Sequence, residues 1–356
     1  MANLAARYVW INKEANYGVS ASGAKVYGEI DEESFKQEFE LMDREDITRY
    51  GKRKSVVGTK YGSGDLTMAL QGDRLCGILI GQVYGANTKT GSGPYANALT
   101  ETADESTFNS WTIAIGRDVM EHRFLGQCLN SLSIGANVNE YVMLSASFVG
   151  CGEDSSGTAG PGSKGFALAG PSESDLHAGD AYHFQGAKII FDSKLSGSNY
   201  SEFVKSVELT YELGRDTENA YALANSTYTR APPPTLREIS GTIEFNRVIT
   251  NPLSGGAGGA GEADHNEPYW NELIQGLQVN GSSGSPAISL NFVSDDPTNE
   301  SLEINLYKVQ FEAPETNLSG RDTQTMSVSF YCLFDETEGA MSDAVWTTSD
   351  NYDVTA

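Results

Sequence analysis

The chain has 356 residues, 39% of them hydrophobic and 10% aromatic, and its 24 basic and 48 acidic residues give a net charge of −24 at pH 7. This length and composition fit a folded protein with two cores of ordinary size and exclude a disordered chain. The charge argues against a nucleic-acid-binding surface, because such surfaces need Lys and Arg to release counterions from phosphates. A strongly acidic surface would also fit a source in a salty medium.

The N-terminal segment and the hydropathy of the chain indicate no membrane association. No stretch of about eighteen consecutive apolar residues is present, as a membrane-spanning helix would need. The first residues also lack a basic segment followed by an apolar one, which a secretory signal has. We therefore expect the protein to be made and assembled in the cytoplasm, with no membrane partner.

Period-two alternation of apolar and polar residues predicts antiparallel strands throughout the chain. Between residues 207 and 213, for example, Val207, Leu209 and Tyr211 face one way, whereas Glu208 and Glu212 face the other. One apolar and one polar face is typical of antiparallel sheets packed as a sandwich or barrel. The predicted strands lie in segments 35–41, 64–70, 112–118, 129–150, 207–213, 236–247, 302–311 and 326–334.

Two short helices are predicted, at residues 73–80 and 268–275. The first begins with Asp73 near the positive end of the helix dipole, and the second has Pro268 near its start and Gly276 just after its end. Segments 82–108 and 251–267 are predicted to be long loops, and the polar segment 335–356 is predicted to be a tail on the surface or on a neighbouring subunit.

The order of these elements indicates an internal duplication. Residues 34–81 run through a strand, a long hairpin loop, a second strand and a helix, and residues 206–276 repeat that order. We predict an all-β-dominated protein with two tandem antiparallel β-sandwich or barrel domains, at 1–151 and 181–356, each with a short helix. The Gly-, Ser- and Pro-rich segment 152–180 is the predicted linker. A duplication makes one chain equivalent to two neighbours of a ring.

No motif indicates catalysis, a metal site or a cofactor. The chain lacks a GxSxG nucleophile elbow, a Walker loop and an HExxH motif, and its four histidines are scattered. Its four cysteines form no close pair: Cys76 and Cys332 are expected in the core, and Cys128 and Cys151 bracket a predicted hairpin. We predict that the protein is not an enzyme.

One local segment reverses the acidic charge of the chain. Three interpretations are open: a solvated loop, a nucleic-acid contact, or a complementary contact with an acidic face of another copy, which we favour because opposite charges steer and register repeated interfaces. The basic residues of this segment are Arg44, Arg49, Lys52, Arg53, Lys54 and Lys60. The matching loop of the second half instead contains Pro232, Pro233 and Pro234, a stiff segment suited to an arm that reaches a neighbour.

The chain resembles the tail tube (major tail) proteins of long-tailed, siphovirus-like viruses of bacteria or archaea, over residues 23–335. The resemblance rests on a strand motif after the hairpin loop, SGDLTM at 63–68 and SGTIEF at 240–245, and on the segment GQCLNSLSI at 126–134. It implies a structural virion protein whose sheets join those of neighbours into a continuous inner barrel, which removes exposed sheet edges.

The resemblance also implies stacked rings that form a hollow tail through which DNA passes without specific binding. Since six single-domain copies usually form a ring, a duplicated chain should form trimeric, pseudo-hexameric rings. The other expected partners are the tape measure, terminator and baseplate proteins. The predicted lumen-lining carboxylates, which would repel phosphates, are Glu38, Glu40, Glu208, Glu212, Glu244 and Glu303. The alternatives are a surface-layer or adhesin-like binding protein and a tail terminator or baseplate hub with the same fold.

Overall fold

The structure is a computed structural model of the chain. It describes residues 7–352 except 46–47, 49, 53, 103–108, 159–164, 173–174, 177–178, 192–203, 224, 226, 229, 247–277, 282–284, 296–297, 314 and 318–324. The described part is dominated by antiparallel strands, so the predicted all-β class is confirmed.

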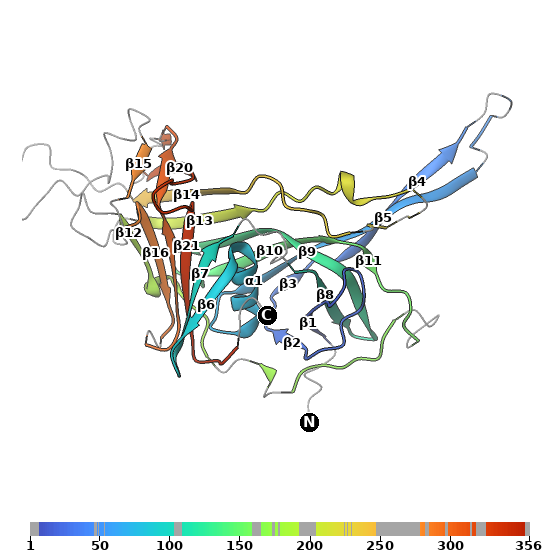
Figure 1. Cartoon of the computed structure of the whole chain (residues 1–356), viewed down its shortest axis with the longest axis horizontal. Helices are drawn as coiled ribbons and strands as arrows, with labels where there is room; N and C mark the ends of the chain where they lie inside the picture. The colour runs from blue at the N-terminus through green and yellow to red at the C-terminus, as the bar shows by residue number, and fades with distance from the viewer. Residues whose placement is uncertain are drawn as a thin grey trace, which may run out of the picture.

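A large antiparallel sheet forms one layer of the molecule (Figure 1). Its strands are neighbours in the order β15, β18, β20, β14, β13, β9, β10, β5 and β3, with β4 also paired to β5 and β19 to β20. Their bounds are β3 Glu32–Glu33, β4 Lys36–Arg44, β5 Lys54–Ala69, β9 Met120–Asn137, β10 Met143–Gly150, β13 Val204–Glu212, β14 Glu238–Asn246, β15 Gln278–Asn280, β18 Lys308–Phe311, β19 Glu315–Asn317 and β20 Thr325–Cys332.

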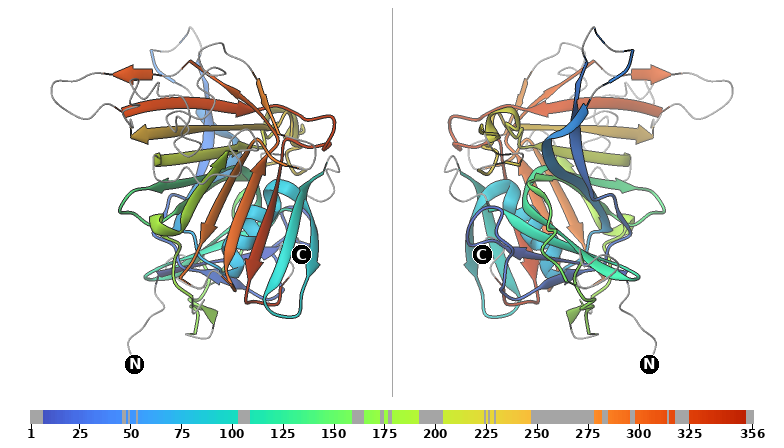
Figure 2. Two further views of the ribbon diagram at one scale, coloured as in Figure 1. Left: turned by 90° about the vertical axis from the view of Figure 1, so that its left-hand side faces the viewer. Right: turned by 90° about the vertical axis from the view of Figure 1, so that its right-hand side faces the viewer.

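A smaller antiparallel sheet packs under one end of the large one, and its strands cross those of the large sheet (Figure 2). Its order is β12 (Ala187–Phe191), β16 (Ile288–Val293), β17 (Ser301–Leu306), β21 (Ser342–Thr348), β7 (Tyr95–Glu101) and β6 (Gly85–Thr90). Buried side chains of both sheets form one core, as in the contact between Phe191 of β12 and Phe245 of β14. The molecule is therefore a sandwich of crossed sheets.

The helix α1 (Arg74–Tyr84) lies between the two sheets and beside a group of N-terminal strands (Figure 1). Asp73 caps it by accepting a hydrogen bond from the backbone N–H of Cys76, and Gly85 ends it in the left-handed conformation. The predicted helix at 73–80 is thus confirmed and is one turn longer than expected. The N-terminal strands are β1 (Arg7–Lys13), β2 (Val26–Gly28) and β8 (Trp111–Arg117), of which β2 contacts the helix, and the short strand β11 (Gly152–Glu153) pairs with β9. Two short 3₁₀ turns complete the described elements, at Phe184–Gly186 and Glu218–Ala220.

Both sheets contain strands from both halves of the chain. The strand β13 of the second half pairs with β9 of the first in the large sheet, and β21 pairs with β7 in the small one. The hydroxyl groups of Tyr84 and Tyr211 lie 2.7 Å apart and link the halves in the core. The division of the chain into two domains at the linker 152–180 remains a prediction. The structure shows that the two predicted domains share both sheets and contact each other in the core.

The described part of segment 152–180 lies along the N-terminal strands. Phe166 pairs with Glu121 of β9, and the backbone of Ala169 accepts a hydrogen bond from the Tyr27 hydroxyl and donates one to Tyr8. This segment is held by contacts that a sequence rich in Gly, Ser and Pro did not indicate.

Two of the predicted irregular segments are wrong. Residues 82–108, expected to be a loop, include the end of α1 and the hairpin of β6 and β7. The strand β6 lies at the edge of the small sheet and is mostly polar, so it lacks the alternation of apolar and polar residues that predicts a strand. The expected surface tail contains β21, an inner strand of the small sheet in which Trp346 is fully buried. The predicted helix at 268–275 and the loop at 251–267 lie outside the described residues.

Candidate assembly surfaces

The large sheet contains the same four-strand unit twice. In the first half the order is β9, β10, β5, β4, and in the second half it is β18, β20, β14, β13. Register matches as well: Gly64 of β5 lies opposite Phe148 of β10, and Gly241 of β14 lies opposite Phe330 of β20. A Cβ atom at either glycine would meet an aromatic ring at 2.5 Å, from Phe35 or Phe330 respectively, so both positions need a residue without a side chain.

The two units join head to tail. The last strand of the second unit, β13, pairs with the first strand of the first unit, β9, over Ser206–Asn137 to Glu212–Ser131. This contact joins opposite edges of the unit, so it is heterologous, and heterologous contacts close into rings when their rotation allows it. Two ends of the large sheet remain, one at β4 and one at β18 and β19. They correspond to β13 and β9, which already pair with each other within the chain.

Those two ends have unpaired edges within the described part of the chain. At one end, β4 pairs only with β5, and at the other, β19 pairs only with β20. The strand β15 covers the part of the second edge formed by β18. Unpaired edges present backbone groups that can pair with another strand.

The outward face of the large sheet is rich in small hydroxyl side chains. Ser145, for example, lies between Thr67 on β5 and Ser133 on β9. A half-open pocket of about 290 Å³ lies on this face over β9, β10, β13 and β14. The serines and threonines that share the face are Thr67, Ser131, Ser133, Ser145, Ser147, Thr210, Ser240, Thr242, Ser327 and Ser329. The prediction for the lumen wall named only carboxylates and missed these hydroxyl residues. The alternation of the strands could have indicated them, because it places them on the same face as the carboxylates.

Four of the six predicted lumen-lining carboxylates share this hydroxyl-rich face. Glu208 lies opposite Thr242 and Gly135, and Glu212 lies opposite Ser131. The Lys205 ammonium group, 3.0 Å from the Glu244 carboxylate, lowers the pKa of Glu244, and the hydrogen bond from Lys36 lowers the pKa of Glu38. Both carboxylates therefore stay ionised at neutral pH.

The other two predicted carboxylates lie elsewhere. Glu40 is exposed at the bulge of β4 between Phe39 and Leu41, where the hairpin leaves the sheet. Glu303 is on β17, opposite Asn291 and Val345, on the outer face of the small sheet. Since the two sheets pack through their apolar faces, Glu303 points away from the hydroxyl-rich face.

The strands β4 and β5 continue beyond the sheet as a two-stranded arm that projects from the body (Figure 1). Its large apolar side chains are not covered: Phe39, Leu41 and Met42 are 55% to 59% exposed, and Val56 and Val57 are more than 40% exposed. The predicted buried face at 35–41 is therefore wrong beyond Phe35, which is itself buried. We refer to residues 39–57 as the arm.

The predicted basic cluster lies along this arm. Arg44 and Lys54 are directly opposite each other, and Lys60 lies opposite Phe39 near the base. Lys52 pairs with the carboxylate of Asp43. Arg49 and Arg53 lie outside the described residues. Whether the cluster contacts another copy remains a prediction.

The predicted Pro arm of the second half contacts its own chain. Arg215 pairs with Pro234, the N–H of Asp216 donates to the carbonyl of Pro233, and Pro232 is buried. The Arg215 guanidinium also donates to the carbonyls of Pro232 and of Leu129 on β9. This segment therefore lies against the first half, and a contact with a neighbouring copy remains a prediction.

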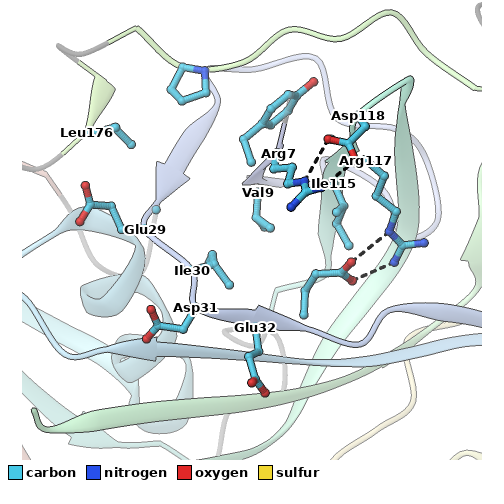
Figure 3. Close-up of a pocket in the computed structure, with 15 residues that line it drawn as sticks. Arg7, Val9, Glu29, Ile30, Asp31, Glu32, Ile115, Arg117, Asp118 and Leu176 are labelled. Carbon is cyan, nitrogen blue, oxygen red and sulfur yellow. Dashed lines mark hydrogen bonds and ion pairs between the residues drawn. The ribbon is translucent and has the colours of Figure 1, made fainter. Parts of the chain in front are cut away.

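A half-open pocket of about 500 Å³ lies between β1, β8 and the segment that leads from β2 to β3 (Figure 3). Two ion pairs lie at one side of it, between Arg7 and Asp118 at 2.9 Å and between Arg117 and Glu33 at 2.8 Å. Its lining also includes Ile30 and the acidic residues Glu29, Asp31 and Glu32. Neither this pocket nor the rest of the described chain brings together three or more His, Cys, Asp or Glu side chains that could hold a metal ion.

All four cysteines are free. Cys76 and Cys332 are buried as expected, Cys128 is buried as well, and Cys151 is half-buried. Within the described residues, no helix combines the length and apolarity needed to cross a membrane.

The fold and surfaces together define a structural β-sheet protein whose repeated units offer edges for further pairing. A family model for phage tail tube proteins matches residues 5–331, nearly the whole chain. The chain therefore belongs to the phage tail tube protein family and is a component of the virion tail that assembles with itself. A search of curated proteins finds no match to the chain.

Proposed function

We propose that three copies of this chain form one ring of the tail tube of a long-tailed virus. The observation that supports this number is the head-to-tail order of the two four-strand units. If the contact between β13 and β9 is repeated between chains, the edge formed by β3 and β4 of one copy pairs with the β19 edge of the next. Six equivalent units then close one inner barrel from three chains.

In this proposal the hydroxyl-rich face of the large sheet lines the lumen. Small hydroxyl groups offer no cation to bind phosphate, and the ionised carboxylates repel DNA over about 8–10 Å near physiological salt. Glu208 and Glu212 supply this repulsion in the second half. Glu244 and Glu38 are also ionised on this face, but each is paired with a lysine, Lys205 at 3.0 Å and Lys36 at 2.6 Å, so these pairs add little net charge. The genome can then slide through the tube without specific binding.

The rings stack into a tube in the host cytoplasm, around the tape measure protein and between the baseplate and the terminator. The protein acts by assembly and not by catalysis. Purified protein imaged by electron microscopy, with the mass of its rings measured by native mass spectrometry, tests the proposal. We expect long tubes and rings of three chain masses. Rings of six chains would overturn the copy number, and single rings that never stack would indicate a terminator.

A further inference from the structure

The arm formed by β4 and β5 has two different faces. Because side chains alternate along each strand, Met42 and Arg44 share one face with their partners Val56 and Lys54. The opposite face carries Leu41 and Val57, followed by Asp43, whose charge is balanced by Lys52. One face is therefore apolar and basic, and the other is apolar and nearly neutral.

The basic face is unfavourable in an isolated chain. Like charges directly opposite each other on paired strands destabilise the pair, and Arg44 and Lys54 have no carboxylate partner among the described ion pairs. A two-stranded hairpin without a third strand or a covering layer is also only marginally stable in water. The arm therefore needs a partner that is both apolar and acidic.

The second half of the chain shows where such an arm can lie. Its equivalent segment, between β13 and β14, packs on the end of the first unit, where Tyr228 is buried and its carbonyl lies 3.7 Å from the Cys151 sulfur. Tyr221, whose ring centroid is 4.7 Å from that of Tyr228, contacts Thr59 of β5. The arm of one unit thus covers the end of the next unit in the sheet.

The matching end of the second unit is exposed. Counting from the equivalent residues Gly64 and Gly241 places Leu236 at the position of Thr59, and counting from Phe148 and Phe330 places Leu333 at the position of Cys151. Leu236 is 85% exposed, and Phe334, next to Leu333, is 57% exposed. We define the end patch as Leu236, Glu238, Tyr331, Phe334 and Glu336, all of them exposed.

We infer that the basic face of the arm docks on the end patch of the next copy in the ring. The partner is a second copy of this chain, because the end patch supplies an apolar surface and carboxylates that complement the apolar, basic face of the arm. Met42 and Val56 cover Leu236 and Phe334, and Glu238 and Glu336 neutralise Arg44 and Lys54. Between chains, this contact would repeat the one that the segment between β13 and β14 makes with the first unit within one chain. The inference rests on the proposed ring.

Disulfide trapping between two variants tests the contact. Chains carrying Val56→Cys are mixed with chains carrying Phe334→Cys or Leu236→Cys, assembled and oxidised, and cross-linked pairs are measured on non-reducing gels. Val57→Cys is the matched control, since it is the neighbouring residue on the other face of the arm. We expect at least tenfold more cross-linking from Val56→Cys than from Val57→Cys.

The result also separates this inference from the proposed function. Tubes that form but give no cross-link from Val56→Cys to either patch residue, or equal cross-linking from Val57→Cys, would overturn the docking and leave the tube intact. Wild-type protein that forms no rings would overturn the proposed function instead.

Charge reversal gives a second test that needs no cysteine. The double variant Arg44→Glu/Lys54→Glu should raise the protein concentration needed for assembly at least tenfold, because two like-charged surfaces would then face each other. Adding Glu238→Lys and Glu336→Lys in the same chain should restore assembly. A double variant that assembles like the wild type would contradict the inference.

Discussion

Leu209 of β13 and Ile134 of β9 lie directly opposite each other, and both are buried where the second unit of the large sheet joins the first. Within the described part of the chain, β13 and β9 form the only pairing that joins one four-strand unit to the other. It therefore allows the energetics of the proposed ring contact to be measured within a single chain.

Leu209→Ala should lower the free energy of unfolding by about 2–5 kcal/mol, through lost burial and the cavity that remains. Denaturant titration of the purified chain measures this effect. The control is Thr210→Ala, on the hydroxyl-rich face one residue away, which should change stability by about 0.5 kcal/mol or less. Equal effects of the two substitutions would show that the join is not packed as described.

The paired glycines Gly64 and Gly241 give a second prediction. Gly64→Ala and Gly241→Ala should each destabilise the protein by about 1–3 kcal/mol, because the added methyl group meets an aromatic ring at 2.5 Å. Gly51→Ala is the control, since a Cβ atom there meets nothing within 4 Å. Thermal unfolding of the three variants compares them. Unchanged stability of Gly64→Ala would contradict the tight packing of β5 against Phe35.

A third prediction concerns the dependence of stability on pH. Burial raises the pKa of Glu101, at the end of β7, above its ordinary value of about 4.5, although its carboxylate accepts a hydrogen bond from the N–H of Met341 at 3.0 Å. An acid with a raised pKa in the folded state binds more protons when folded. Its contribution to stability is therefore lost as the pH rises from the unfolded-state pKa through the folded-state pKa.

Glu101→Gln should remove this dependence, because the amide oxygen can still accept from Met341 and carries no charge. The difference in Tm between variant and wild type should grow in favour of the variant as the pH rises through that window. Glu312→Gln, at an exposed side chain outside the proposed contacts, is the control and should not show the same trend. A constant difference for Glu101→Gln would argue against a buried charge at this position.

Much of the fold followed from local patterns. The alternation that places Glu208 and Glu212 on one face and Leu209 on the other is local to β13, so the sequence alone predicted it. The acidic residue Asp73, favoured at the positive end of a helix dipole, similarly marked the start of α1. By contrast, β6 has mostly polar residues because it is an edge strand, and no periodic signal indicated it.

What the sequence could not provide is the relation between distant segments. The join of β13 to β9 depends on strand order, and a duplication is compatible with separate domains as well as with one shared sheet. Likewise, Glu303 has the same alternation as Glu208, yet it belongs to the other sheet and faces the opposite way. A period of two distinguishes two faces of a strand but does not specify which sheet contains it.

Because Glu208 and Glu303 lie on the outer faces of different sheets, charge reversal at the two positions can show which sheet faces the DNA. Replacing Glu208, Glu212 and Glu244 together with Lys should leave tube assembly intact and reduce genome delivery at least tenfold, because cations on the lumen wall would bind the phosphates that carboxylates repel. Counts of plaques and of adsorbed particles that retain DNA measure the effect. Glu303→Lys is the control: it changes the charge on the outer face of the small sheet, so it should leave delivery unchanged. If the triple variant delivered its genome normally, the hydroxyl-rich face would not line the lumen; if Glu303→Lys alone blocked delivery, the small sheet would have to face the DNA instead.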